Sequence, residues 1–135
     1  MAVKKGVKAL VAAAEADIET MSVAEVKAAQ EGGNATIVDL RDVRELWREG
    51  KIPGAVHAPR GMLEFWVDPA SPYHRDVFAS GNKFIFYCQS GWRSALATKA
   101  VQDMGLEPVA HIGGGFTAWV EAGLPTEEVK PKERK

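Results

Sequence analysis

Apolar residues follow two patterns along the chain, one typical of amphipathic helices and one typical of buried strands. Apolar side chains recur at helical spacing from residue 3 to residue 16, which predicts an amphipathic helix at the start of the chain. Short runs of β-branched, aromatic and other apolar residues predict strands further on. These predicted strands cover residues 18–21, 36–40, 55–58, 84–87 and 108–112.

Helix start and stop signals separate the predicted strands. Ser22 and Glu25 have the spacing of a capping box, and the helix that it opens is expected to end at residues 32–33, both glycine. Further helices, each followed by glycine, are predicted over residues 43–49, 95–104 and 116–122. Ser94 is the predicted N-cap of the second of these, which is rich in alanine.

The alternation of strands and helices predicts an α/β fold with a mainly parallel sheet of about five strands and helices on both faces. We expect a single such domain over residues 18–126, preceded by a helical extension over 1–17. The tail over 127–135 alternates in charge and is predicted to be disordered.

A long connection over residues 62–78 interrupts this alternation and carries Phe65, Trp66 and Tyr73. Connections of this length inside a compact domain are often functional. Its aromatic side chains either wall one side of a site or belong to the core.

Composition narrows the classes of function. Hydrophobic residues make up 46% of the 135 positions and the net charge is −1, so charge gives no case for binding nucleic acid or a membrane. The single cysteine cannot form an internal disulfide. The apolar run over 9–14 is shorter than the core of a secretory signal, about 7–15 residues, so a cytoplasmic protein is expected.

The candidate chemistry centres on Cys88, which stands where the predicted strand over 84–87 stops. A loop follows, made of Gln89, Ser90, Gly91, Trp92 and Arg93. A strand, a glycine-bearing loop and a helix N-terminus together form an anion-binding arrangement, which favours a thiolate over a thiol. Arg93 adds a charged, forked donor. The alternative is that Cys88 is a small buried apolar residue, as lone cysteines most often are.

Two other groups of residues are candidates for supporting roles. Asp39 and Arg41 follow the strand over 36–40 at the carboxyl edge of the predicted sheet, where ligands gather in open α/β folds. They are either site residues, or residues that pair with each other or brace neighbouring loops. The second interpretation is favoured, and it is also favoured for Arg44 and Glu45. The three glycines over 113–115 are interpreted as a close-packed turn beside the site. No metal or cofactor is expected, because no tight cluster of histidine and carboxylate side chains is evident.

The loop over residues 88–94, with Cys88, Arg93 and Ser94, resembles the active-site loop of rhodanese-like sulfurtransferases. The resemblance spans roughly residues 20–126, and three further motifs carry it. These lie at 37–41 with Glu45, at 52–55, and at 111–116 with Trp119.

This resemblance implies transfer of a sulfane sulfur from thiosulfate or a persulfide donor to cyanide or a thiol acceptor. Cys88 would carry the sulfur as a persulfide, and residues 89–94 would bind the substrate. The implied partners are a small anionic donor, a cyanide or thiol acceptor and a protein thiol.

Two rival classes share features of this loop. Cysteine-dependent phosphatases and arsenate reductases also join a thiolate loop to an arginine, but the phosphatase loop is one residue longer than the four residues between Cys88 and Arg93. The other rival is a binding module that keeps the fold without catalysis, against which the presence of both Cys88 and Arg93 argues.

Overall fold

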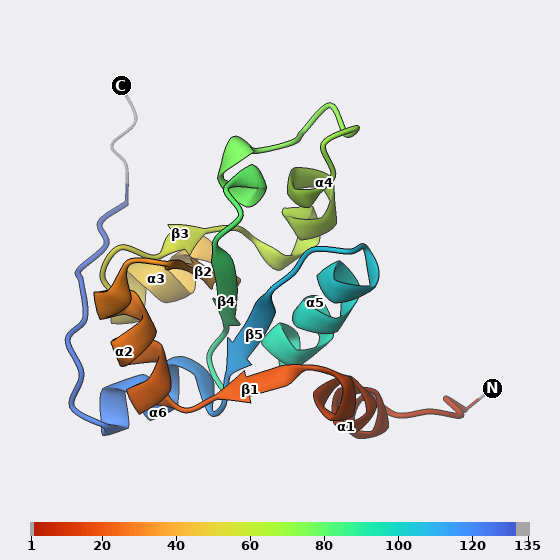
Figure 1. Cartoon of the computed structure of the whole chain (residues 1–135). Coiled ribbons are helices and arrows are strands. Elements are labelled where there is room, and N and C mark those ends of the chain that lie inside the picture. The colour runs from red at the N-terminus through yellow and green to blue at the C-terminus, as the bar shows by residue number, and fades with distance from the viewer. Residues whose placement is uncertain (1, 132–135) are drawn as a thin grey trace.

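Five parallel strands form the central sheet of the computed structural model, which describes residues 2–131. Their spatial order is β1-β5-β4-β2-β3, so β4 lies in the middle of the sheet (Figure 1). The strands are β1 (Glu19–Met21), β2 (Ala35–Asp39), β3 (Val56–His57), β4 (Lys83–Tyr87) and β5 (Val109–Ile112). All four pairings are parallel, which confirms the predicted α/β fold.

Six α-helices and two 3₁₀ turns connect and cover the strands (Figure 1). The helices are α1 (Val7–Asp17), α2 (Val23–Gly32), α3 (Val43–Glu49), α4 (Leu63–Val67), α5 (Trp92–Asp103) and α6 (Gly115–Glu121). The 3₁₀ turns are η1 (Arg60–Met62) and η2 (Asp76–Ala79). Among residues 2–131, no helix is both long and apolar enough to span a membrane.

Side chains of β4 alternate between two apolar layers, one on each face of the sheet. Ile85 and Tyr87 pack in the layer that contains α2 and α6, including Trp119. Phe84 and Phe86 pack in the layer that contains α4 and α5. All four are fully buried, and burying one such side chain stabilises the fold by about 1.5–3 kcal/mol. The predicted covering of both faces is therefore confirmed.

The N-terminal extension packs on the domain. The helix α1 starts at Val7, later than residue 3, and its buried residues Val11 and Ala14 contact Ala95 of α5. Gly6 is the N-cap, and Val3 beyond it is 82% exposed, so the residues before Val7 lack the burial that would support a helix.

The predicted disordered tail begins with an ordered residue. The backbone of Glu127 exchanges two hydrogen bonds with that of Lys51, at N···O distances of 3.0 and 2.8 Å. The prediction of disorder from residue 127 is therefore wrong for Glu127, and its last part, 132–135, lies outside the described residues.

The long connection contains the short helix α4, which the sequence pattern does not predict. Its residues Leu63 and Val67 are buried in the same apolar layer as α5. Part of the aromatic connection is therefore core. Phe65 and Tyr73 face outward instead, in an edge-to-face pair with ring centroids 6.4 Å apart.

Candidate active site

Cys88 lies directly after β4, and α5 begins four residues later at Trp92. The N-cap of α5 is Gly91, whose φ of 113° lies in the left-handed region that favours glycine. The prediction of Ser94 as the N-cap is wrong, because the glycine conformation lets the helix start directly from the loop. Ser94 lies inside the first turn of α5 and faces the sulfur.

Two backbone amides converge on the sulfur of Cys88. The N–H of Gly91 donates to Sγ at 3.2 Å and the N–H of Ser94 donates at 3.4 Å. The Ser94 hydroxyl lies 3.6 Å from the same sulfur. Donors arranged in this way at a helix N-terminus stabilise negative charge, so the arrangement fits a sulfur anion.

Asp39 and Arg41 form a buried ion pair that braces the loop. Both are fully buried, with Nη2 of Arg41 at 2.7 Å from a carboxylate oxygen of Asp39. Arg41 also donates to the side-chain oxygen of Gln89 at 3.1 Å and to the backbone oxygen of Gly50 at 2.7 Å. Burial alone would lower the pKa of Arg41, but hydrogen bonding and charge from Asp39 raise it above its ordinary value. The favoured interpretation, in which the two residues pair, is the one observed.

The second loop arginine has a carboxylate partner. Arg93 donates from Nη1 and Nη2 to the two carboxylate oxygens of Glu45, at 2.8 and 3.0 Å. This bidentate bond lowers the pKa of Glu45 and raises that of Arg93. Arg44 and Glu45 do not pair with each other, since Arg44 bonds to Asp42 at the start of α3. Glu45 instead braces the neighbouring loop through Arg93, which is the other part of the favoured interpretation.

The glycine turn before α6 packs directly against the cysteine loop. The N–H of Phe116 donates to the backbone oxygen of Cys88 at 2.9 Å, and that of Thr117 donates to the oxygen of Gln89 at 3.1 Å. A Cβ on Gly115 would stand 2.5 Å from the Cys88 oxygen, closer than any side chain tolerates. The expectation of a close-packed turn beside the site is therefore met.

His111 is a neighbour of the site that was not predicted as a site residue, although it is the first residue of the motif over 111–116. Its Nδ1 lies 2.9 Å from the hydroxyl of Ser94, and its Nε2 lies 3.1 Å from the hydroxyl of Thr20. His111 comes from β5 and Ser94 from α5, so only the packing of these two elements brings them together. A signal was available, because histidine is an unusual residue in a strand that is buried throughout.

Trp92 of the loop and the aromatic residues of the long connection occupy different places. Trp92 is the first residue of α5 and is half exposed beside the loop. The guanidinium carbon of Arg75 lies 4.3 Å from the ring centroid of Trp66. Tyr73 packs on Phe65. For Trp66 and Tyr73 a place at the site stays a prediction.

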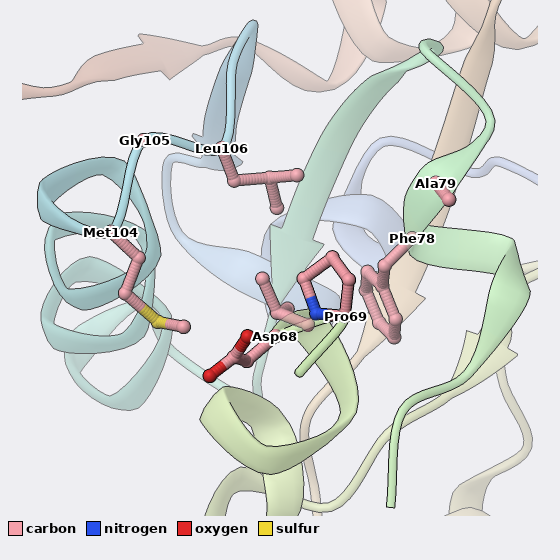
Figure 2. A pocket seen from close by; sticks show the side chains of 8 residues that line it. Asp68, Pro69, Phe78, Ala79, Met104, Gly105 and Leu106 are labelled. Carbon is pink, nitrogen blue, oxygen red and sulfur yellow. The ribbon is translucent and has the colours of Figure 1, made fainter. Parts of the chain in front are cut away.

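A pocket of about 480 Å³, shown in Figure 2, has no residue of the cysteine loop over 88–94 in its lining. Met104 and Leu106 form one wall and Phe78 another, with Asp68 also in the lining. Met104 and Leu106 lie between α5 and β5 and Phe78 precedes β4, so these three residues are near the end of the sheet opposite Cys88. The lining contains no cysteine, serine or histidine. Within the described part of the chain, no three histidine, cysteine or carboxylate side chains are placed to hold a metal ion.

A family model and several known proteins are similar to this chain. The model of the Rhodanese-like domain matches residues 22–122. Thiosulfate sulfurtransferase 16 of Arabidopsis thaliana, a chloroplastic protein, is 42% identical over 96 residues, which cover 67% of this chain and 78% of the plant protein. Another match, to an uncharacterised Synechocystis protein, covers only 29% of that relative.

Two solved structures extend the comparison. A Rhodopseudomonas palustris protein of unknown function, described as a possible tyrosine phosphatase, is 52% identical with a TM-score of 0.91, covering 94% of this chain and 98% of its own. The polysulfide-sulfur transferase of Wolinella succinogenes is 30% identical with a TM-score of 0.69, covering 90% and 87%. With the family model matched over most of the chain, this protein belongs to the rhodanese-like domain family.

Proposed function

We propose that this protein is a sulfurtransferase that carries a sulfane sulfur on Cys88 between an anionic donor and a nucleophilic acceptor. The observation that supports it most is the convergence of the Gly91 and Ser94 amides on the Cys88 sulfur. A sulfur anion at the end of a strand, held by backbone donors, is what both halves of such a reaction require. Two relatives named as sulfurtransferases point the same way.

The first half-reaction loads the cysteine. The thiolate of Cys88 attacks the outer sulfur of thiosulfate, a new S–S bond forms, and the S–S bond of thiosulfate breaks. Sulfite leaves with the electron pair of that bond. The forked guanidinium of Arg93 is the proposed partner of the sulfonate oxygens of the donor. A persulfide or polysulfide donor would react in the same way, with a thiolate or shorter polysulfide as the leaving group.

The second half-reaction removes the outer sulfur from the Cys88 persulfide. Cyanide or an acceptor thiolate attacks the outer sulfur of the Cys88 persulfide, and thiocyanate or a new persulfide leaves. The electron pair of the broken S–S bond returns to Cys88 as a thiolate, which the two loop amides stabilise as a leaving group. The reaction is covalent catalysis, for which ping-pong kinetics are expected.

The remaining loop residues have supporting roles in this proposal. The side chain of Gln89 bonds to Arg41 and Thr117, so it holds the loop in place rather than reaching for substrate. Ser90 lies at the centre of the loop and Trp92 borders its outer rim. We propose that acceptors are small thiols, cyanide or the thiol of a partner protein.

The test is direct detection of the loaded cysteine. After treatment with thiosulfate, intact-mass spectrometry should show one added sulfur atom that cyanide removes, with thiocyanate as the product. Cys88→Ser should take up no sulfur, while Thr98→Val, a buried change further along α5, should load normally. Full turnover by Cys88→Ser would show that this cysteine is not the carrier.

A phosphatase is the second candidate, because the Rhodopseudomonas relative is described as a possible tyrosine phosphatase. The short loop between Cys88 and Arg93 argues against a phosphatase, and assays with thiosulfate and with aryl phosphates distinguish the two functions.

A further inference from the structure

A buried histidine stands behind the reactive sulfur and has no role in the reaction as described so far. His111 is 1% exposed, and its ring lies between α5 and the first elements of the chain. Its Nδ1 contacts Ser94 at 2.9 Å. Its Nε2 lies 3.1 Å from the hydroxyl of Thr20 on β1 and 3.9 Å from the carboxylate of Glu15 on α1.

Ser94 links this histidine to Cys88. Its hydroxyl has one proton and two acceptors in reach, the Nδ1 of His111 at 2.9 Å and the backbone oxygen of Gly91 at 3.3 Å. When the proton lies on the shorter bond, a lone pair of Ser94 Oγ faces the Cys88 sulfur at 3.6 Å and accepts the thiol proton. The three groups then form a continuous chain of hydrogen bonds from sulfur to imidazole.

The surroundings of His111 favour the neutral form of its ring. Burial lowers its pKa, and the smaller opposing effect is the negative charge of Glu15. The other groups that face the ring are the hydroxyls of Thr20 and Ser94. The Cys88 thiol lies on the far side of Ser94. A neutral imidazole with an acceptor at one nitrogen and a donor at the other can take a proton and release one.

We propose that Ser94 and His111 form a proton relay that carries the thiol proton of Cys88 toward the hydroxyl of Thr20 at the surface. The proposal rests on the proposed function only in that Cys88 must react as a thiolate. The Cys88 thiol donates its hydrogen bond to the hydroxyl of Ser94, so its proton starts on this path.

The proton transfers balance without leaving a charge on the ring. The thiol proton moves to Ser94 Oγ, the hydroxyl proton of Ser94 moves to Nδ1 of His111, and the proton on Nε2 leaves to the hydroxyl of Thr20, 3.1 Å away. Thr20 is exposed, so its hydroxyl accepts this proton and releases its own to water. The Ser94 hydroxyl now donates to the thiolate, and His111 donates to Ser94 from Nδ1. Ser94 and His111 are therefore positioning residues that act on the sulfur.

The relay is tested by the rate at which iodoacetamide alkylates Cys88 as a function of pH, since only the thiolate reacts. Ser94→Ala should slow alkylation at pH 7 by about 10-fold or more, the effect of losing one hydrogen bond to a charged group. His111→Asn should shift the pH profile in the same direction, because an amide oxygen at the Nδ1 position keeps the proton of Ser94 and the hydroxyl then donates less to the thiolate.

Matched controls separate the relay from general disturbance. Thr98→Val changes another buried hydroxyl of α5, and Glu19→Gln removes a surface carboxylate that pairs with Lys83. Both should alkylate like the wild type. A wild-type pH profile in Ser94→Ala would overturn the relay, and this variant carries the test even if His111→Asn does not fold. Alkylation that responds as predicted in a protein unable to transfer sulfur would support the relay and refute only the proposed function.

Discussion

The guanidinium of Arg93 lies across the carboxylate of Glu45, with Nη1 and Nη2 at 2.8 and 3.0 Å from its two oxygens. The arginine proposed to hold the donor therefore already has an anionic partner. Glu45 is held in turn by the start of α3, where it accepts a hydrogen bond from the backbone of Asp42. A sulfonate must share the guanidinium with this carboxylate or displace it, so Glu45 weakens donor binding while it fixes the position of the arginine.

Changing Glu45 and changing Arg93 should shift the affinity for the donor in opposite directions. Glu45→Gln keeps an oxygen for the Asp42 amide but removes the competing charge, so the thiosulfate concentration for half-maximal rate should fall. Arg93→Lys keeps the charge but loses the fork, so this concentration should rise by about 10-fold, as expected for one charge-assisted hydrogen bond. Steady-state kinetics with varied thiosulfate measure both. An equal effect of the two changes would contradict the competition.

The same pair should contribute a small pH dependence to stability. Hydrogen bonding from Arg93 lowers the pKa of Glu45 in the folded protein, so its contribution is present at neutral pH. It is lost as the pH falls below the ordinary carboxyl range and through the lowered value. Because the Arg93 side chain is 42% exposed, the contribution should stay below about 1 kcal/mol. Urea unfolding at pH 7 and pH 3 should show a slightly smaller acid loss in Glu45→Gln than in the wild type.

Gly115→Ala should disable the site through the backbone. The new Cβ would stand 2.5 Å from the Cys88 oxygen, and φ at this position is +60°. The turn must shift, which pushes on the loop and weakens the bonds from α6. Gly123→Ala is the matched control, since φ there is +76° but nothing lies within 4 Å. Thermal unfolding and sulfur loading should both suffer in Gly115→Ala, whereas Gly123→Ala should lose only some stability.

Local patterns were enough to predict most of the frame that holds this site. The apolar run ending at Tyr87 and the run ending near Asp39 predict two strands, and the parallel register pairs these two residues directly. The residues that follow each strand therefore emerge side by side at one edge of the sheet. This is why Arg41 could be named from the sequence as a candidate for a supporting role beside Cys88.

Contacts that depend on packing between distant elements could not be predicted in the same way. Ser94 has the residue type of an N-cap, but the left-handed conformation of Gly91 starts the helix earlier and turns Ser94 toward the sulfur. His111 is 17 residues from Ser94, and no local pattern joins them. The helix α4 escaped prediction because it is only five residues long and its neighbours are aromatic and turn-forming.

Trp92 should limit which acceptor reaches the persulfide. Its side chain is 46% exposed next to the loop, so Trp92→Ala should change stability by only about 0.5 kcal/mol. The ratio of rates with a bulky thiol and with cyanide should rise. Met104→Ala, at the other end of α5 and 44% exposed, should leave this ratio unchanged. If the unfolding midpoint of Trp92→Ala drops sharply while the ratio stays fixed, the ring is structural.

The length of the loop should decide between sulfur transfer and phosphate hydrolysis. Four residues separate Cys88 from Arg93, one fewer than in the phosphatase loop, and the ring of amides is correspondingly small. It suits a single sulfur atom on Cys88 better than a tetrahedral phosphoryl group. The wild-type protein should therefore turn over thiosulfate and leave aryl phosphates intact. Inserting one glycine after Gly91 should weaken sulfur transfer and allow phosphate or arsenate to bind. Phosphatase activity that the unmodified protein shows and that Cys88→Ser abolishes would instead favour the phosphatase assignment.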